Sequence, residues 1–379
     1  MIVKKSNEVR AAIQKLVDEH AIDTAVQLSI TLPLQQGDVF FNDISSLDHD
    51  AFVLQKHMKD YGFNYSHKQA LMGVMISDLL KQSPLGTMVS DEIFNALITE
   101  SKMFAKEELS ENPYIQNISF EKNKKIGNYV LEKAHLKRFS LFFYDIPQIE
   151  VNGARIPRIG SVEHRYDYPL IGAENSDVWM SITPNEIYTM KQSIDESFGN
   201  VLTLGCGMGY YAYMVSEKES VKGVTIIEKS PEIIDLFESY ILPQFQHKEK
   251  IKLVQADAFD YMEELDDGIY DYCFADIWKN NLDSLSYMKL KRICKKFQKT
   301  KMSYWIEKAI LHGLRSYVEG VLLQSMSEGF EKPFDFNIDE EQEKARRYIS
   351  DIYKDEVIAN PADIDNLLKF ENIINKIIA

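Results

Sequence analysis

Three glycines at alternate positions, Gly205, Gly207 and Gly209, follow the apolar run 201–204. A backbone that turns sharply out of a buried strand and passes close to a ligand favours residues that carry no Cβ atom. Residues with helical spacing come next, so the stretch predicts a strand, a glycine turn and a helix whose first amides face the space above the turn. The pattern therefore indicates a ligand that is bound mainly by backbone atoms.

Three acidic residues lie downstream, each at the end of a strand-like run: Glu228, Asp257 and Asp276. Because the carboxyl ends of parallel strands meet at one edge of a sheet, we expect these carboxylates to share one rim beside the glycine turn. Glu228 follows Gly205 by 23 positions, where a βαβ unit places an acid that accepts hydrogen bonds from ribose hydroxyls. Any one acid alone could be a solvated loop residue, but the set predicts a site for a nucleoside-containing ligand.

The spacing of the glycines distinguishes a dinucleotide, which has a pyrophosphate group, from a ligand without one. The dinucleotide fingerprint G-x-G-x-x-G has its third glycine where this chain has Tyr210. The pattern here is G-x-G-x-G, which argues against a pyrophosphate group on the turn. A glycine turn that serves only close packing is the alternative explanation for the motif taken alone.

The glycine turn and the acids that follow it resemble motif I and the succeeding strands of the class I S-adenosylmethionine (SAM)-dependent methyltransferases. The resemblance covers roughly residues 180–310, about a third of the chain. It implies an α/β fold with a Rossmann-like, doubly wound and mostly parallel sheet, and it implies SAM as the cofactor.

The resemblance also assigns roles to individual residues. The glycines would line the methionine and ribose part of SAM, and Glu228 would hold the ribose hydroxyls. Asp257 would face the adenine amino group, and Asp276 would lie beside the transferred group. The expected cofactor-binding residues are Leu204, Gly205, Cys206, Gly207, Gly209, Glu228, Lys229, Asp257, Ala258 and Asp276.

Some positions depart from the family patterns. Thr203 stands where these methyltransferases commonly carry an acid, so the contact with the amino group of the ligand is less secure than the ribose contact.

The stretches 226–234 and 257–259 also resemble the polyamine aminopropyltransferases (the spermidine synthase family), which use decarboxylated SAM. Against that activity, Met208 replaces an Asp of the family's turn, and 276–280 lacks its Asp-Pro. Lys279 also puts a positive charge where a diamine needs anionic partners.

The expected reaction is direct displacement of the sulfonium methyl group onto a small molecule or a peptide. This reaction requires an aligned acceptor and, for some acceptors, removal of a proton, and Asp276 is the expected catalytic residue. No metal is expected, because Asp276 and Asp283 lack a third ligand. An aminopropyltransferase-like enzyme and a non-catalytic protein that binds SAM or a nucleoside are the competing hypotheses.

The elements that position these residues fall into four predicted regions. These are a mainly helical N-terminal domain (1–145), a β-rich connecting segment (146–180), a SAM-binding Rossmann-like domain (181–310) and a helical C-terminal extension (311–379). Helical spacing is found over 8–19, 66–81 and 90–104, Asn152-Gly153 predicts a type I′ hairpin, and 183–186 form a capping box. A fifth strand is expected at 302–307, with no antiparallel pair after it.

Polar and aromatic residues gather in the connecting segment, just before the predicted cofactor domain. We expect substrate contacts and a lid there, and the candidates are His164, Tyr166 and Tyr168. Aromatic residues at such spacing more often pack a structural core, so this interpretation competes with a purely structural one.

Charge and composition limit the partners. The formal charge of −15 over 379 residues disfavours nucleic acid, because an acidic surface repels phosphates. One helix with seven Lys or Arg between Lys289 and Lys301 opposes this trend, either as a solvated face or as a patch that binds an anionic partner. The N-terminal domain could bind substrate or join two copies into a homodimer.

Apolar runs and cysteines bear on the cellular compartment. No apolar run reaches membrane-spanning length, and the first residues lack the apolar core of a signal peptide. We therefore expect a cytoplasmic protein without a membrane partner. Cys206, Cys273 and Cys294 show neither paired nor metal-ligand spacing, so they are expected to be reduced, buried thiols.

Overall fold

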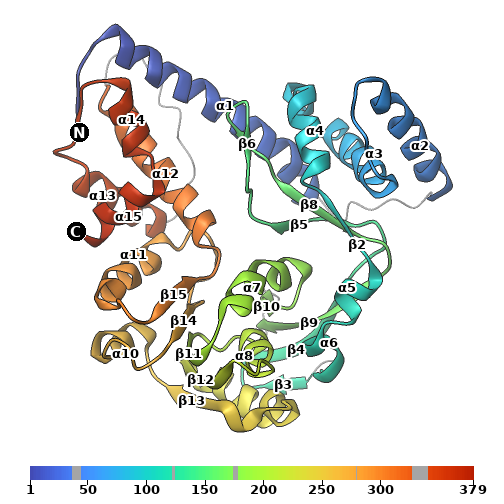
Figure 1. The fold of residues 1–379 in the computed structure, drawn as a ribbon, viewed down its shortest axis with the longest axis vertical. Coiled ribbons are helices and arrows are strands. Elements are labelled where there is room, and N and C mark those ends of the chain that lie inside the picture. Colours follow the sequence, from blue (N-terminus) through green and yellow to red (C-terminus); the bar gives the residue numbers. More distant parts are fainter. Residues whose placement is uncertain (36–43, 122–123, 174–177, 279, 327–339) are drawn as a thin grey trace.

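A five-stranded parallel sheet organises the C-terminal half of the chain (Figure 1). The computed structural model describes residues 1–35, 44–121, 124–173, 178–278, 280–326 and 340–379. The strand order is β13-β12-β11-β14-β15, and each neighbouring pair is parallel. The strands are β11 (Gly199–Leu204), β12 (Val221–Glu228), β13 (Ile251–Gln255), β14 (Tyr272–Ala275) and β15 (Lys301–Tyr304). The order reverses beside β11, and open α/β sheets bind ligands at such a point.

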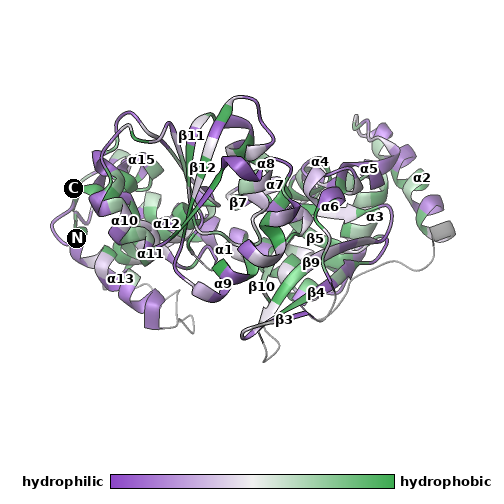
Figure 2. Cartoon of the chain, turned by 90° about the horizontal axis from the view of Figure 1, so that it is seen from below, coloured by the Kyte–Doolittle hydropathy of each residue, from purple (hydrophilic) through white to green (hydrophobic). Residues whose placement is uncertain are grey.

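Helices cover both faces of this sheet. Val201, Ile226 and Phe274 pack in one hydrophobic cluster with α7, α8 and α9, whereas Leu202 and Cys273 belong to a second cluster with α10, α11 and α12. Neighbouring residues of a strand point to opposite faces, so a continuous apolar run is buried on both sides. In Figure 2 the hydrophobic stretches of α11 and α12 are green. The helices are α7 (Pro184–Glu196), α8 (Tyr210–Ser216), α9 (Pro231–Leu236), α10 (Ala258–Glu264), α11 (Ser284–Ile293) and α12 (Glu307–Gln324).

The α/β class and the parallel sheet of the prediction are confirmed. The strand expected at 302–307 is β15, which pairs in parallel with β14. Among the described residues, no strand pairs antiparallel with this sheet. The basic stretch between Lys289 and Lys301, predicted as one helix, is helical only in part, because α11 ends at Ile293 and a 3₁₀ turn follows it.

Two smaller sheets and a hairpin connect the N-terminal helices to the parallel sheet. One sheet has the order β2-β8-β5, and the other is antiparallel with the order β10-β9-β4-β3. Asn152 and Gly153 have φ values of 50° and 84° between β6 and β7, which confirms the predicted hairpin. The strands are β2 (Lys102–Phe104), β3 (Lys124–Ile126), β4 (Tyr129–Leu136), β5 (Leu141–Asp145), β6 (Glu150–Val151), β7 (Ala154–Arg155), β8 (Arg158–Val162), β9 (Tyr166–Ala173) and β10 (Val178–Ser181).

The N-terminal region contains six helices among its described residues. Ser66 and Ser90 cap α3 and α4 through their hydroxyl groups. The prediction of one helix over 90–104 is wrong at its end: 102–104 form β2, since backbone pairing with β8 outweighs the local helical pattern. The helices are α1 (Asn7–Gln35), α2 (Ile44–Asp60), α3 (His67–Lys81), α4 (Asp91–Thr99), α5 (Lys106–Ser110) and α6 (Pro113–Asn117).

Helix α1 links the two ends of the molecule (Figure 1). Its first turns place Val9 and Ile13 in the same hydrophobic cluster as the C-terminal helices, whereas Val26 and Ile30 pack with α3. Beside it, β1 (Ile2–Val3) pairs with β16 (Val357–Ile358). The remaining C-terminal elements are α13 (Glu340–Ile352), α14 (Pro361–Leu367) and α15 (Phe370–Ile378).

Several contacts cross the predicted domain boundaries. Strand β4 of the N-terminal region pairs along its length with β9 of the connecting segment, and α1 packs on the C-terminal helices. The boundaries themselves stay predictions. None of the helices in the described ranges is long and apolar enough to cross a membrane.

We expect Ile13→Ala to lower the free energy of unfolding by about 2–5 kcal/mol, because the side chain is fully buried and its loss leaves a cavity. Leu28→Ala on the same helix is the matched control, since Leu28 is 38% exposed and should lose less. Urea denaturation followed by circular dichroism measures both variants. Equal losses would contradict the packing of the first turns of α1 into the C-terminal core.

Candidate ligand site at the glycine turn

The three glycines adopt backbone conformations that other residues avoid. Gly205, Gly207 and Gly209 have φ values of 94°, 53° and 73°. A Cβ atom on Gly205 would come within 2.2 Å of the Asp276 carbonyl oxygen, and one on Gly209 within 2.5 Å of the Phe237 ring. A Cβ atom on Gly207 would meet nothing closer than a sulfur atom 3.9 Å away. Packing therefore requires the outer two glycines, whereas the middle one borders open space.

Side chains from the N-terminal region form hydrogen bonds with residues in and next to the glycine turn. Tyr114 of α6 is fully buried, and its hydroxyl donates a hydrogen bond to the Met208 carbonyl. Asn112 donates from Nδ2 to the Tyr210 hydroxyl over 2.9 Å. These contacts join residues about one hundred positions apart, so the turn depends on the N-terminal region for its position.

The carboxylate of Glu228 connects the end of β12 to the glycine turn. One oxygen accepts the amide hydrogen of Cys206 at 3.0 Å, and the other accepts those of Lys229 and Ser230 at 2.8 Å each. Three backbone donors fix the orientation of this carboxylate. The lone pair that remains on Oε2 therefore points in a defined direction beside the turn.

Asp257 is engaged at the next strand end. Its Oδ1 accepts the amide hydrogen of Phe259 at 2.9 Å and caps α10, which begins at Ala258, while Oδ2 accepts from the Lys229 ammonium at 2.9 Å. Burial pushes the pKa of Asp257 up, but the hydrogen bonds from Lys229 and from the backbone bring it below its usual value. Because Lys229 is largely exposed, its side chain can move aside for a ligand.

Asp276 lies at the end of β14, on the other side of the turn. Its amide donates to the Leu204 carbonyl over 2.9 Å, which joins β14 to β11. Burial, reinforced by the Glu186 carboxylate, raises the pKa of the Asp276 carboxyl to about 8. At neutral pH this group therefore holds its proton.

Glu186 is a site residue that the sequence analysis identified only as part of a helix cap. Its carboxylate accepts hydrogen bonds from the Thr183 amide (2.9 Å), the Thr183 hydroxyl (3.2 Å) and the Ser181 hydroxyl (3.0 Å). Burial raises the pKa of Glu186, although these bonds favour the ionised form. The capping box at 183–186 was the available signal, because it placed an acid on the helix that leads into β11.

Of the other residues named from the sequence, Tyr166 lies near this arrangement: burial, and then the neighbouring Tyr210 and Glu186, raise its pKa. His164 is exposed. Tyr166 is buried, donates to the Ile182 carbonyl over 3.3 Å and stacks on Tyr168 with 6.0 Å between ring centroids. Asp283 accepts the amide hydrogen of Ser286 and caps α11.

Two further sequence assignments concern charge and redox state. Lys279 lies outside the described residues. The three cysteines are free and buried, which confirms the expectation of reduced thiols. Burial, with a further contribution from Glu228, raises the pKa of the Cys206 thiol. Cys206 is therefore protonated at neutral pH and contributes its backbone amide.

No protein-family model matches this chain, and no curated protein matches its sequence. Solved structures that are similar over part of the chain include both families named from the sequence. A spermidine synthase in complex with the transition-state analogue AdoDATO is 15% identical, with a TM-score of 0.27, over 37% of this chain and 52% of its own. The spermidine synthase from Thermotoga maritima is 13% identical, with a TM-score of 0.28, over 45% of this chain and 67% of its own.

An SAH-bound methyltransferase from Podospora anserina is 15% identical, with a TM-score of 0.29, over 50% of this chain and 68% of its own. The chain thus spans only about half the length of the first of these structures.

The raised pKa of Asp276 predicts a pH-dependent stability. Its folded-state pKa is about 8 against the ordinary 3.8, so the folded chain retains a proton that the unfolded chain releases. The stabilisation from this group is full below about pH 4 and is lost as the pH rises through about 8. We expect Asp276→Asn to raise the melting temperature at pH 9 and to change it less at pH 5. Differential scanning fluorimetry measures this, and a difference that is constant across the range would refute the raised pKa.

Proposed function

We propose that the chain is a SAM-dependent methyltransferase that acts on a small molecule or a peptide. The observation that carries the proposal is the Glu228 carboxylate, which three backbone amides hold beside the glycine turn. A carboxylate fixed in this way suits a ribose hydroxyl, since the remaining lone pair of Oε2 can accept a hydrogen bond from it. A doubly wound, Rossmann-like arrangement of helices around β11 is part of the proposal.

The open space beside Gly207 supports close approach of a ligand to the backbone. Gly207 needs its positive φ for the turn, yet a Cβ atom there would have no packed neighbour. We assign the methionine and ribose part of SAM to this space, between Leu204 and Gly209. The adenine would then lie toward Asp257 and Ala258, with Lys229 moving aside.

When bound, SAM supplies a methyl group on a sulfonium: the new bond uses a lone pair of the acceptor, and the C–S electron pair stays on sulfur. Asp276 orients the acceptor and, in its ionised form, takes the proton that the acceptor loses. Its carboxyl is protonated at neutral pH in the free chain. A cationic ligand beside Asp276 favours the ionised carboxylate, so binding of the ligand lowers the pKa of this group and makes it able to accept a proton.

The pair of acids at the site favours one alternative function. Asp276 and Glu186 together would suit an amine substrate, as an aminopropyltransferase-like enzyme that uses decarboxylated SAM requires. A protein that binds SAM or a nucleoside without catalysis would keep Glu228 and the turn but release no product. Ligand preference and turnover distinguish the three.

We expect isothermal titration calorimetry to show binding of SAM and of S-adenosylhomocysteine. Glu228→Gln should weaken both by at least about tenfold, because the new NH₂ group faces backbone donors and cannot accept a hydrogen bond from ribose. Glu232→Gln is the matched control, since that carboxylate contacts the Ser230 hydroxyl one turn away. Preference for decarboxylated SAM would favour the aminopropyltransferase alternative, and a folded protein that binds none of the three would refute the proposal.

We expect methyl transfer, followed as release of S-adenosylhomocysteine, to rise with pH and to level off at or below about pH 8, as Asp276 ionises. Asp276→Asn should slow it by about 10²- to 10⁴-fold and remove this pH dependence. Asp266→Asn, at an exposed acid after α10, is the control. An Asp276→Asn enzyme with the wild-type rate and pH profile would exclude Asp276 as the base.

A further inference from the structure

A cavity of about 690 Å³ lies between α1, α12, α14, α15 and the segment 147–150. A smaller cavity of about 130 Å³ shares six lining residues with it and extends it between α1 and α12. Neither is lined by a residue of the glycine turn or by its acids. Sites for small molecules typically enclose about 300–1,000 Å³, so the larger cavity could hold an organic ligand.

His312 of α12 is the most unusual side chain of this cavity. It is only 8% exposed, and its ring has no hydrogen-bond partner among the described residues. The ring packs edge-on against Phe370, with 4.9 Å between centroids. Burial, and then the charges of Arg155, Arg315 and Lys308, lower the pKa of His312 to about 3. The imidazole is therefore neutral and borders three cations.

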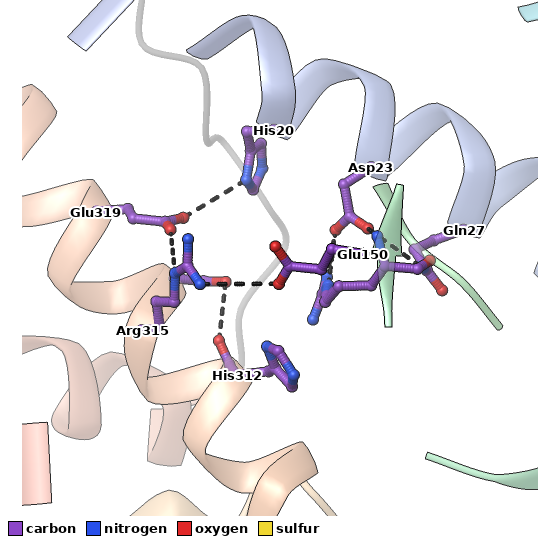
Figure 3. A network of polar contacts seen from close by, with 9 residues as sticks. His20, Asp23, Gln27, Glu150, His312, Arg315 and Glu319 are labelled. Atoms are coloured by element: carbon purple, nitrogen blue, oxygen red, sulfur yellow. Dashed lines mark hydrogen bonds and ion pairs between the residues drawn. The ribbon is translucent and has the colours of Figure 1, made fainter. Parts of the chain in front are cut away.

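Two of the cations, Lys308 and Arg315, lie on α12, whereas Arg155 lies on β7. The arginines are only partly neutralised, and Figure 3 shows Arg315 beside Glu150 and Glu319. Arg155 of β7 donates from Nε (2.9 Å) and Nη2 (2.5 Å) to the Asp23 carboxylate of α1. Arg315 donates from Nε to Glu319 over 3.0 Å, whereas its Nη1 is 3.8 Å from Glu150, beyond hydrogen-bond distance. A guanidinium has five N–H donors, so both arginines retain donors beyond these acids.

The positive charge of Lys308 is the least neutralised of the three, because its ammonium contacts neutral oxygens. Its ammonium contacts the carbonyl and side-chain oxygens of Gln148, at 3.3 and 3.2 Å, and both are neutral groups. Asp23 and Glu319 pair with the two arginines, and the carboxylates of Glu19, Glu150 and Asp365 also line the cavity. The ammonium of Lys308 contacts neutral oxygens, so its charge is the one that a bound anion would neutralise most.

We propose that this cavity binds a small organic molecule through a phosphate group, held by Lys308, Arg155 and Arg315 with the His312 ring as a neutral donor. A phosphate offers several charged oxygens, which match guanidinium and ammonium donors better than one carboxylate does. The apolar side chains of Leu16, Ile149 and Leu368 line the same cavity and suit the organic part of the ligand. This site is separate from the glycine turn and does not depend on the proposed methyl transfer.

Inorganic phosphate and pyrophosphate are the probes, compared with sodium chloride at equal ionic strength in calorimetry and differential scanning fluorimetry. We expect saturable binding and a raised melting temperature for the wild type. Lys308→Met should weaken binding by at least about tenfold, and Lys308→Arg should retain most of it. His312→Leu removes the neutral donor without changing the charge, so it should weaken binding independently of Lys308.

Lys301→Met is the matched control, because it also removes one lysine charge but from an ion pair with Glu196 outside the cavity. Circular dichroism in chloride buffer checks that each variant is folded. Wild-type binding no stronger than that of chloride, or equal affinities for wild type, Lys308→Met and His312→Leu, would overturn the proposal. SAM calorimetry on Lys308→Met should match the wild type, which separates this site from the one at the glycine turn.

Discussion

The geometry of the glycine turn depends on one set of charge-assisted hydrogen bonds, which three backbone amides donate to the Glu228 carboxylate. These amides belong to the loop after β12 and to the loop after β11, so the carboxylate adds a link between two neighbouring strands at the point where their pairing ends. A charged acceptor makes each bond stronger than a neutral one. The Lys229 and Ser230 amides hold the carboxylate in place, and a shift of the turn would cost the Cys206 amide its acceptor. The turn is therefore preorganised before any ligand arrives.

Packing from the other elements leaves the turn little freedom. The Asp276 carbonyl lies against Gly205, and the Phe237 ring lies against Gly209. Tyr114 of α6, in the N-terminal region, fixes the turn through the hydrogen bond that its hydroxyl donates to the Met208 carbonyl. The N-terminal region thus contributes to the site without supplying a reactive group, and this gives it a structural role beside any role in substrate binding.

Burial sets the charge of the groups that matter in both proposed sites. Desolvation disfavours the ionised form, so it keeps a proton on Asp276 and keeps a proton off His312. Neighbouring charges act in the same direction in each case, an acid beside Asp276 and cations beside His312. Both groups are therefore neutral in the free chain, and both would respond to a ligand of the opposite charge to their neighbours.

The amino-acid sequence by itself determined the features that depend on neighbouring residues. The strand, glycine turn and helix at 201–215, the caps at Ser66 and Thr183, and the Asn152-Gly153 hairpin follow from backbone preferences and short-range hydrogen bonds. The family resemblance implied a mostly parallel sheet, and the acids at the ends of the strand-like runs predicted which residues meet at one edge.

Only the tertiary structure decided which distant residues meet. It brought Glu186 to Asp276, placed Tyr114 against the turn, converted 102–104 into a strand and brought Arg155 of β7 to His312 of α12. None of these contacts leaves a periodic signal, because the partners lie on different elements. Their pKa shifts depend on burial, and burial exists only once those elements have packed.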